Sequence, residues 1–243
     1  MISSRTSSSR GTEIATPLEK NYFDIQQAID SAAVSVGRDP ADVLLVAVSK
    51  MVGISEIQNA IDAGIHDFGE NRTHLLREKQ QTFPNENWHY IGNIQTNKLK
   101  DVVGKACLIH SVASERALKA IDRLAQKLGI RQSILLEVNV SGEATKEGAS
   151  PAELPKILEA AGNNPSVQVR GLMTMAPLMH TTEKADTRRV FTALRELRDK
   201  MVPIFAGAKN ISLNELSMGM SDDFTEAIQE GATMVRIGRR LWS

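Results

Sequence analysis

The sequence predicts an α/β protein built as a single (β/α)8 TIM-type barrel with a leading N-terminal helix. Short, nearly continuous apolar runs alternate with segments of helical periodicity along most of the chain. Eight such strand candidates span about 200 residues, close to the usual size of a closed barrel. No strand candidate is followed by a G-x-G-x-x-G fingerprint or a P-loop, which disfavours the alternative, an open doubly wound nucleotide-binding sheet.

Composition narrows the class of protein further. The 243 residues are 42% hydrophobic and 24% charged, with 29 basic and 29 acidic side chains and no net charge. No global field therefore attracts nucleic acid or a membrane surface. The single cysteine, Cys107, excludes an internal disulfide and a multi-cysteine metal site, and no apolar run reaches the roughly 20 residues of a membrane span. We expect a cytoplasmic protein.

The first element follows a short polar leader. Residues 1–16 are expected to form a disordered tail, and residues 17–243 one barrel domain. Apolar residues recur at helical spacing over Pro17–Val36, which predicts the leading helix. The valine-rich run Val43–Ser49 then predicts a strand buried on both faces, with Lys50 at its C-terminal end.

The remaining elements repeat this alternation. The predicted strands are His66–Gly69, Trp88–Ile91, Leu108–Val112, Ser133–Val140, Val167–Met173, Leu213–Ser217 and Thr233–Ile237. The predicted helices are Ile54–Ala63, Arg72–Gln80, Glu115–Leu128, Ala152–Ala161, Glu183–Met201 and Asp222–Glu230.

Polar residues gather where these strands end. Active sites of such barrels lie at the C-terminal ends of the strands. The residues found there are Ser49-Lys50, Gly69-Glu70-Asn71, Gly92-Asn93, His110-Ser111, Asn139, Ser217 to Ser221 and Arg236-Ile237-Gly238.

Lys50 is the candidate nucleophile. A lysine that follows an apolar strand projects into a protein-lined mouth, where desolvation favours the neutral amine that Schiff-base chemistry needs. The alternative is a lysine that only pairs with a phosphate or a barrel carboxylate.

The loops after the seventh and eighth strands predict an anion site. Leu216–Ser221 is rich in small residues, and Ser221-Asp222-Asp223 has the pattern of an N-cap followed by an acidic first turn. Arg236 and Gly238 supply a cation and a close backbone approach after the last strand. Phosphate sites of these barrels commonly form from the same two loops. The alternative is plain capping with a surface arginine.

A metal centre is not expected, because the five histidines show no ligand spacing. His89 and His110 lie within strands and are expected to be hydrogen-bonded barrel residues.

Several motifs together resemble one known family. They are Val46-Ala47-Val48-Ser49-Lys50, Phe68-Gly69-Glu70-Asn71, Trp88-His89-Tyr90-Ile91-Gly92 with Gln95 and Asn97-Lys98, Val138 to Ser141 with Lys146 and Gly148, Gly171-Leu172-Met173, Leu216 to Asp223, and Val235-Arg236-Ile237-Gly238. The series covers about residues 17 to 242 and resembles the pyridoxal phosphate homeostasis protein family, also called the proline synthase co-transcribed family.

This resemblance implies an alanine-racemase-like barrel of fold type III that carries pyridoxal 5′-phosphate (PLP) as an internal aldimine on Lys50. It places Asn71 and Met173 along the cofactor pocket. It maps the phosphate contacts onto Ser217, Gly219, Ser221, Arg236 and Gly238. The expected role is binding of this vitamin B6 cofactor in intracellular PLP homeostasis.

Three departures from the family pattern occur. Met51-Val52 follows Lys50 where members often carry Thr and Lys, and Arg239 replaces a small hydroxyl residue after Gly238. The last residues are Leu241-Trp242-Ser243 in place of Phe-Gly.

Three functions stay open from the sequence. The favoured one is a PLP carrier without robust catalysis. A PLP-dependent amino-acid racemase is the first alternative, but it takes its second base, a tyrosine, from an additional domain, and only Tyr22 and Tyr90 are present here. A Schiff-base aldolase acting on a phosphorylated substrate is the second. Expected partners are PLP and PLP-dependent apo-enzymes, and the expected assembly is a monomer or weak homodimer.

Overall fold

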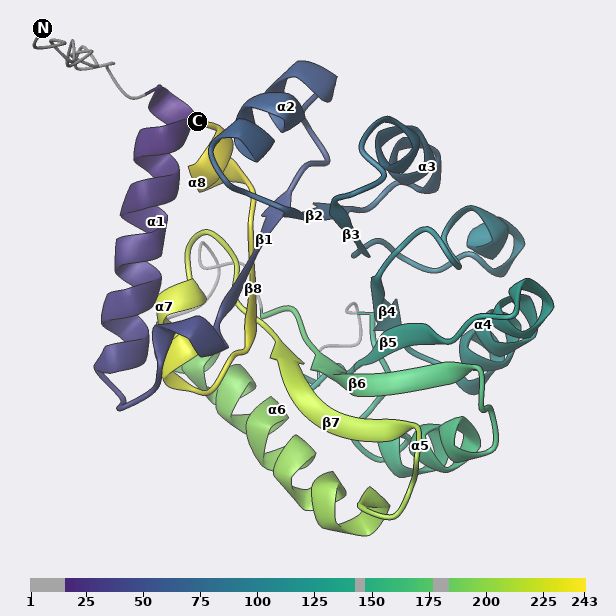
Figure 1. Cartoon of the computed structure of the whole chain (residues 1–243). Helices are drawn as coiled ribbons and strands as arrows, with labels where there is room; N and C mark the ends of the chain where they lie inside the picture. The colour runs from purple at the N-terminus through teal and green to yellow at the C-terminus, as the bar shows by residue number, and fades with distance from the viewer. Residues whose placement is uncertain (1–15, 143–146, 177–183) are drawn as a thin grey trace, which may run out of the picture.

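A computed structural model describes residues 16–142, 147–176 and 184–243 of the chain. Eight parallel strands form a closed barrel in which each strand pairs with the next and β8 pairs with β1. Figure 1 shows the helices arranged around the outside of this barrel. The predicted barrel is therefore confirmed, and the open sheet is excluded.

The strands are β1 (Leu44–Val48), β2 (Asp67–Glu70), β3 (Asn87–Tyr90), β4 (Leu108–Val112), β5 (Gln132–Glu137), β6 (Val167–Met173), β7 (Ile211–Ser217) and β8 (Met234–Ile237). The helices are α1 (Pro17–Val34), α2 (Ile54–Asp62), α3 (Thr73–Thr82), α4 (Glu115–Leu128), α5 (Leu154–Gly162), α6 (Lys184–Phe205), α7 (Phe224–Gln229) and α8 (Arg239–Trp242). Two 3-10 helices, η1 (Pro40–Asp42) and η2 (Thr96–Asp101), complete the described elements.

The leading helix α1 is confirmed, and it ties both ends of the described chain together. Thr16 and Glu19 form a capping box at its start, and its buried face packs against α7 and α8. The side-chain amide of Asn21 donates hydrogen bonds to the carbonyl oxygens of Leu241 (3.3 Å) and Ser243 (2.7 Å). The C-terminal turn is thereby held against the first helix. Of the predicted tail, residues 1–16, Thr16 belongs to the start of α1, and residues 1–15 lie outside the described residues.

Two kinds of core result from the alternation of side chains along each strand. A large apolar cluster fills the space between the strands and the helices. A second, small cluster consists of Leu108, Leu135, Met173 and Met234, on β4, β5, β6 and β8. Since Arg236 lies two residues after Met234, it shares the same face of β8.

The seam between β6 and β7 is the tightest in the barrel. A Cβ on Gly171 would lie 1.9 Å from the backbone oxygen of Glu215. The register shifts here between Val169 and Gly171, so the two backbones cross where only glycine fits.

Several predicted boundaries are wrong in detail. Strand β5 ends at Glu137 rather than Val140, because its partner β6 ends at Met173 and the chain from Val138 pairs with Ala149 instead. Helix α7 begins at Phe224, and its N-cap position is Asp223 rather than Ser221. The 3-10 helix η2 and the short helix α8 were not predicted from the sequence.

Candidate functional site

The end of β1 places Lys50 at the mouth of the barrel. β1 is short and apolar, as the sequence predicts, and Lys50 follows it in a turn with an exposed side chain. The backbone just before it is fixed from three sides. The amide of Ser49 donates to Gly69 (2.8 Å), the indole of Trp242 donates to the carbonyl of Val48 (2.8 Å), and the Lys79 ammonium donates to the carbonyl of Ser49 (2.7 Å).

The described residues offer the amine of Lys50 no hydrogen bond or ion pair. The alternative in which this lysine pairs with a barrel carboxylate therefore finds no support in the described part of the chain. A primary amine on a fixed backbone is what a condensing aldehyde requires.

Asn71 lies on the neighbouring strand end, after β2. Its backbone amide donates to the side chain of Glu70 (2.8 Å), and its own side chain is exposed. It lines a cavity of about 320 Å³ together with Arg72, His74, Tyr90 and Lys98, among others. A Cβ on Gly92 would lie 2.1 Å from the Asn71 carbonyl oxygen, so the loop after β3 passes this backbone closely.

Ser217 at the end of β7 and Arg236 on β8 lie at the centre of the predicted anion site. Arg236 donates from Nη1 to the hydroxyl of Ser217 (2.6 Å) and from Nη2 to the carbonyl of Thr174 (3.0 Å). Both side chains are buried, with Arg236 only 4% exposed. The structure thus brings these two predicted residues together inside the barrel rather than on its surface.

Burial without a counter-ion distinguishes Arg236. Within the described residues no carboxylate lies within ion-pair distance of its guanidinium. Burial lowers the pKa of Arg236 to about 10, although the charges of Asp223 and Glu137 raise it. The side chain is therefore cationic at neutral pH, with Asp223 and Glu137 near it but no described carboxylate at ion-pair distance.

A chain of hydrogen bonds reaches Ser217 from the other end of the barrel. His89 bonds from Nε2 to Asp67 (3.0 Å) and from Nδ1 to His110 Nε2 (3.0 Å), and His110 Nδ1 lies 2.9 Å from the Ser217 hydroxyl. Burial lowers the pKa of His89, but bonding to Asp67 and Cys107 outweighs it and raises that pKa to about 9. The two histidines are thus hydrogen-bonded barrel residues, as predicted.

The ring of His110 joins His89 to Ser217. Burial, His89 and Arg236 together lower the pKa of His110 well below its usual range, which favours the neutral imidazole. A neutral imidazole donates from one ring nitrogen and accepts at the other, so His110 bonds in opposite senses to His89 and Ser217. The hydroxyl of Ser217 contacts His110 and also accepts from Arg236.

The loops after β7 and β8 lie side by side. The carbonyl of Gly219 accepts from the backbone amide of Arg236 (3.0 Å), and Gly219 adopts a positive φ of 93°. Arg239 pairs with Asp222 across the two loops at 2.5 Å, where both side chains are exposed. The residue that departs from the family pattern thus joins the two loops predicted to bind phosphate.

Ser221, Gly238 and Met173 have different surroundings. The backbone amide of Arg240 donates to the hydroxyl of Ser221 (3.5 Å), and Gly238 packs against Val48 near the end of β1. Met173 is buried in the small cluster within the barrel and is 1% exposed. The described structure therefore does not show it on the surface of a cavity.

Burial also raises the pKa of Glu137 at the end of β5, to about 7, with Glu147 adding to the shift and Arg236 opposing it.

Sequence reasoning missed the contributions of Lys79, Trp242 and Thr174. The sequence analysis assigned no role to Lys79, and a backbone carbonyl such as that of Thr174 has no sequence signal.

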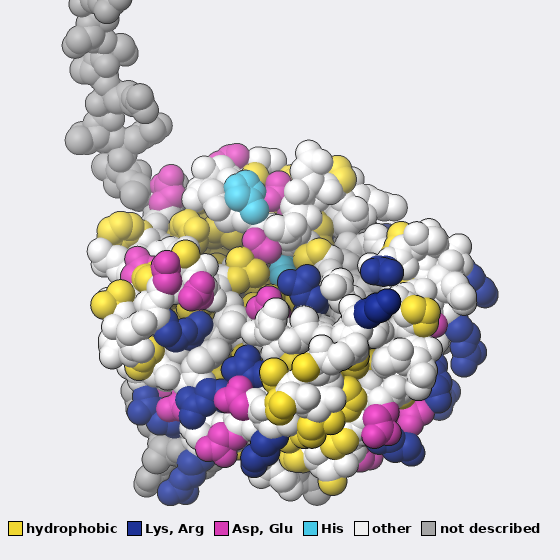
Figure 2. Space-filling view, turned by 60° about the horizontal axis from the view of Figure 1, so that its bottom comes forward, with side chains coloured by type: hydrophobic (Ala, Val, Ile, Leu, Met, Phe, Trp, Pro, Cys, Tyr) yellow, Lys and Arg dark blue, Asp and Glu magenta, His cyan; other side chains and the backbone are white. Residues whose placement is uncertain are grey.

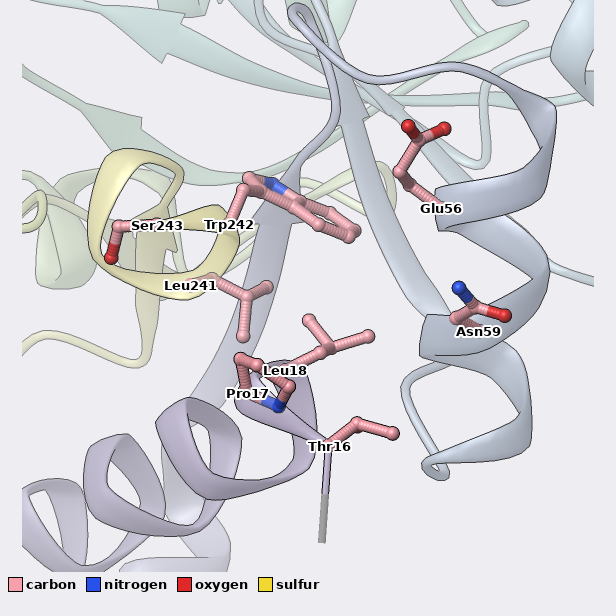
Figure 3. Close-up of a pocket in the computed structure, with 8 residues that line it drawn as sticks. All are labelled: Thr16, Pro17, Leu18, Glu56, Asn59, Leu241, Trp242 and Ser243. Carbon is pink, nitrogen blue, oxygen red and sulfur yellow. The ribbon is translucent and has the colours of Figure 1, made fainter.

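A separate cavity of about 420 Å³ lies outside the barrel. Figure 3 shows its walls, which come from the start of α1, from α2 and from the C-terminal turn. None of the predicted site residues lines it. Its one link to the site is Trp242, whose indole reaches the end of β1.

Two further classes of site are absent from the described part of the chain. No group of three or more His, Cys, Asp or Glu side chains there is arranged to hold a metal ion. No described helix has both the length and the apolar character that a membrane crossing requires. On the face seen in Figure 2, acidic and basic side chains are interspersed.

Comparison with known proteins decides the family. A family model described as the N-terminal domain of alanine racemase matches residues 28–242. A pyridoxal phosphate homeostasis protein from Aquifex aeolicus is 40% identical over 220 residues, which cover 90% of this chain and 94% of the relative. The chain belongs to the pyridoxal phosphate homeostasis protein family.

Two solved structures are similar to the structure of this chain. PipY of Synechococcus elongatus, solved with PLP bound, has a TM-score of 0.80 and 32% identity, covering 93% of this chain and all of PipY. Alanine racemase from Corynebacterium glutamicum has a TM-score of 0.69 and 16% identity, covering 93% of this chain but 60% of the racemase. The latter likeness shows the alanine-racemase-like fold alone.

Proposed function

We propose that this protein binds PLP as a Schiff base on Lys50 and acts in PLP homeostasis. The observation that carries the proposal is the pairing of two groups on adjacent strands. Lys50 presents an exposed amine after β1, and Arg236 on β8 is a buried cation without a carboxylate partner. The family membership and the PLP-bound PipY structure support it independently.

The residues present fit the chemistry of PLP. Arg236 and Ser217 would contact the phosphate from inside the barrel, Arg236 as a cation and Ser217 through its hydroxyl. Gly219, Ser221 and Gly238 would border the same phosphate from the segments after β7 and β8. Asn71 and Met173 are proposed to border the cofactor, although the structure does not bring them into contact.

Bound PLP supplies an aldehyde, which condenses with the Lys50 amine with loss of one water molecule. The protein orients that amine by fixing the backbone of Ser49 and Val48. It holds a positive charge at Arg236, with no described carboxylate at ion-pair distance from the guanidinium. These tasks are binding tasks, and we propose a carrier without robust catalysis.

The tyrosines support the carrier over the racemase. Tyr90 is buried, donates its hydroxyl to the carbonyl of Asn93 (3.0 Å), and has its pKa raised to about 12 by burial, with Glu70 adding to the shift. Tyr22 lies on the outer helix α1, where its hydroxyl accepts from Gln26. Both hydroxyls are thus already engaged by other residues of the chain, and neither contacts Lys50.

The first test is the visible spectrum of the purified protein with excess PLP, followed by borohydride reduction and peptide mapping. We expect an absorption band and a reduced pyridoxyl adduct on the peptide that contains Lys50. Lys50→Ala should lose both, whereas the control Lys119→Ala, which removes a partly exposed lysine on helix α4, should keep both. A wild-type protein without band or adduct would contradict the proposal and favour the aldolase alternative.

A second assay separates carrier from racemase. We expect the PLP-loaded protein to leave the optical rotation of L-alanine unchanged over hours, at a concentration where a racemase control completes the reaction. Steady racemisation that disappears in Lys50→Ala would instead establish the enzyme.

A further inference from the structure

A buried ion pair lies directly beneath the mouth of the barrel. The ammonium of Lys79 on α3 lies 2.6 Å from Glu70 at the end of β2, and the two side chains are 3% and 0% exposed. Burial of two charges carries a desolvation cost that their attraction alone often fails to offset. Stability alone therefore does not explain why the Lys79–Glu70 pair lies buried at the mouth of the barrel.

The carboxylate of Glu70 organises the loop after β2. While one oxygen meets Lys79, the other accepts hydrogen bonds from the backbone amides of Asn71 (2.8 Å) and Arg72 (3.0 Å). The position of Asn71 relative to β2 thus depends on this side chain.

The ammonium of Lys79 organises the end of the neighbouring strand. It donates to the carbonyl of Ser49 (2.7 Å) and lies 3.4 Å from the Ser49 hydroxyl. Ser49 is the residue immediately before Lys50. With Glu70, these contacts use all three N–H groups of Lys79, so its own amine is not free for an aldehyde.

The geometry of the Lys79–Glu70 pair differs from that of an ion pair between two residues of one helix. Lys119 and Glu115 on α4 form such a pair at 2.7 Å, with side chains 48% and 30% exposed and four residues apart. Lys119 contacts no strand end there, whereas Lys79 and Glu70 join three elements at the residues that flank the site.

We infer that Lys79 and Glu70 are positioning residues that hold Lys50 and Asn71 in register at the mouth of the barrel. This inference rests on the proposed function, because it names what presents the Lys50 amine to PLP. The pair touches the backbone at both strand ends that flank the proposed site. Its removal should loosen the mouth while the barrel stays closed.

The test compares PLP binding with stability in three variants. Lys79→Met leaves a buried carboxylate alone and should lower both the melting temperature and the affinity for PLP. The loss of affinity should be about tenfold or more, as for groups that support a bound metal from its outer shell. Lys119→Met, the matched control, should change neither.

The double variant Lys79→Met/Glu70→Leu separates positioning from stability. Replacing both charges with apolar groups removes the lone buried carboxylate and should recover much of the melting temperature. PLP affinity should stay low, and hydrogen exchange should remain faster at Lys50 and Asn71 than in the wild type, with α4 unchanged.

Two results would overturn the inference. One is a double variant in which PLP affinity returns together with stability, which would make the pair structural only. The other is a folded Lys79→Met protein with wild-type affinity. Failure of the wild type to form an adduct on Lys50 is a different result, since it removes the proposed function itself.

Discussion

At the end of β1, Lys50 extends an exposed amine from a backbone that buried partners hold in place. At β8, on the adjacent strand, the charged group of Arg236 is itself buried, and its hydrogen bonds lead into the barrel. The first region fixes the main chain and leaves the reactive group accessible. The second fixes the reactive group. A lysine that reacts with an incoming aldehyde needs a fixed backbone and an accessible amine, as at the end of β1. A cation that stays in a region of low dielectric needs fixed hydrogen-bond partners, as at β8.

The largest expected effect breaks the buried side of this comparison. Arg236→Met should weaken PLP binding by about 100-fold, because loss of a buried, hydrogen-bonded charge from an interface costs about 3 kcal/mol. Titration by absorbance measures the change. Binding within a few-fold of the wild type would show that the guanidinium does not face the cofactor.

The next effect concerns the histidine chain and pH. The folded-state pKa of His89 is raised from 6.5 to about 9, so its contribution to stability is complete below about pH 6.5 and is lost as the pH rises through about 9. The shift corresponds to at most about 3 kcal/mol of unfolding free energy. Urea unfolding at about pH 6 and about pH 9.5 should show this loss in the wild type.

His89→Gln should flatten that pH dependence, because no proton is taken up at this position. His66→Gln is the control, since His66 pairs with Glu86 at a more exposed site. An unchanged pH profile in His89→Gln would show that His89 is neutral in the folded protein.

A smaller effect tests how firmly the β1 side is held. Trp242→Phe removes the indole donor to the carbonyl of Val48 but keeps most of the ring packing. We expect a loss of about 1 kcal/mol of unfolding free energy, the usual net worth of one hydrogen bond. Hydrogen exchange that stays unchanged at the end of β1 would contradict this role of Trp242.

The smallest effect lies at the rim. Arg239→Ser restores the small hydroxyl residue common in the family and removes the pair with Asp222, whose side chains are 68% and 46% exposed. An exposed pair contributes about 1 kcal/mol or less, so thermal unfolding should hardly change. A large drop in melting temperature would show that this bridge is needed to keep the two loops together.

The sequence predicts the barrel well because its signal is the alternation of apolar runs and amphipathic segments. The bounds predicted for β4, α4 and β6 agree with the structure at both ends. Prediction failed where tertiary contacts decide the geometry. Residues 96–101 form a 3-10 helix, and β5 ends early because the chain after it pairs with Ala149.

The candidate site divides in the same way. Lys50, Ser217 and Arg236 could be named from the sequence because strand ends and family motifs mark them. The burial of Arg236 and the inward turn of Lys79 could not, because both depend on which partners the closed barrel brings across its interior. A periodic pattern shows which face of an element is apolar, but not where a long basic side chain ends.

The single thiol, Cys107, offers a site for labelling the protein. It is the sole thiol, it is exposed, and it immediately precedes β4, at the opposite end of the barrel from Lys50. A single fluorophore attached there lies away from both strand ends of the proposed site, although it replaces the thiol that contacts His89. Energy transfer from that dye to a pyridoxyl chromophore would then report loading and release in real time, in a chain that needs no engineered cysteine.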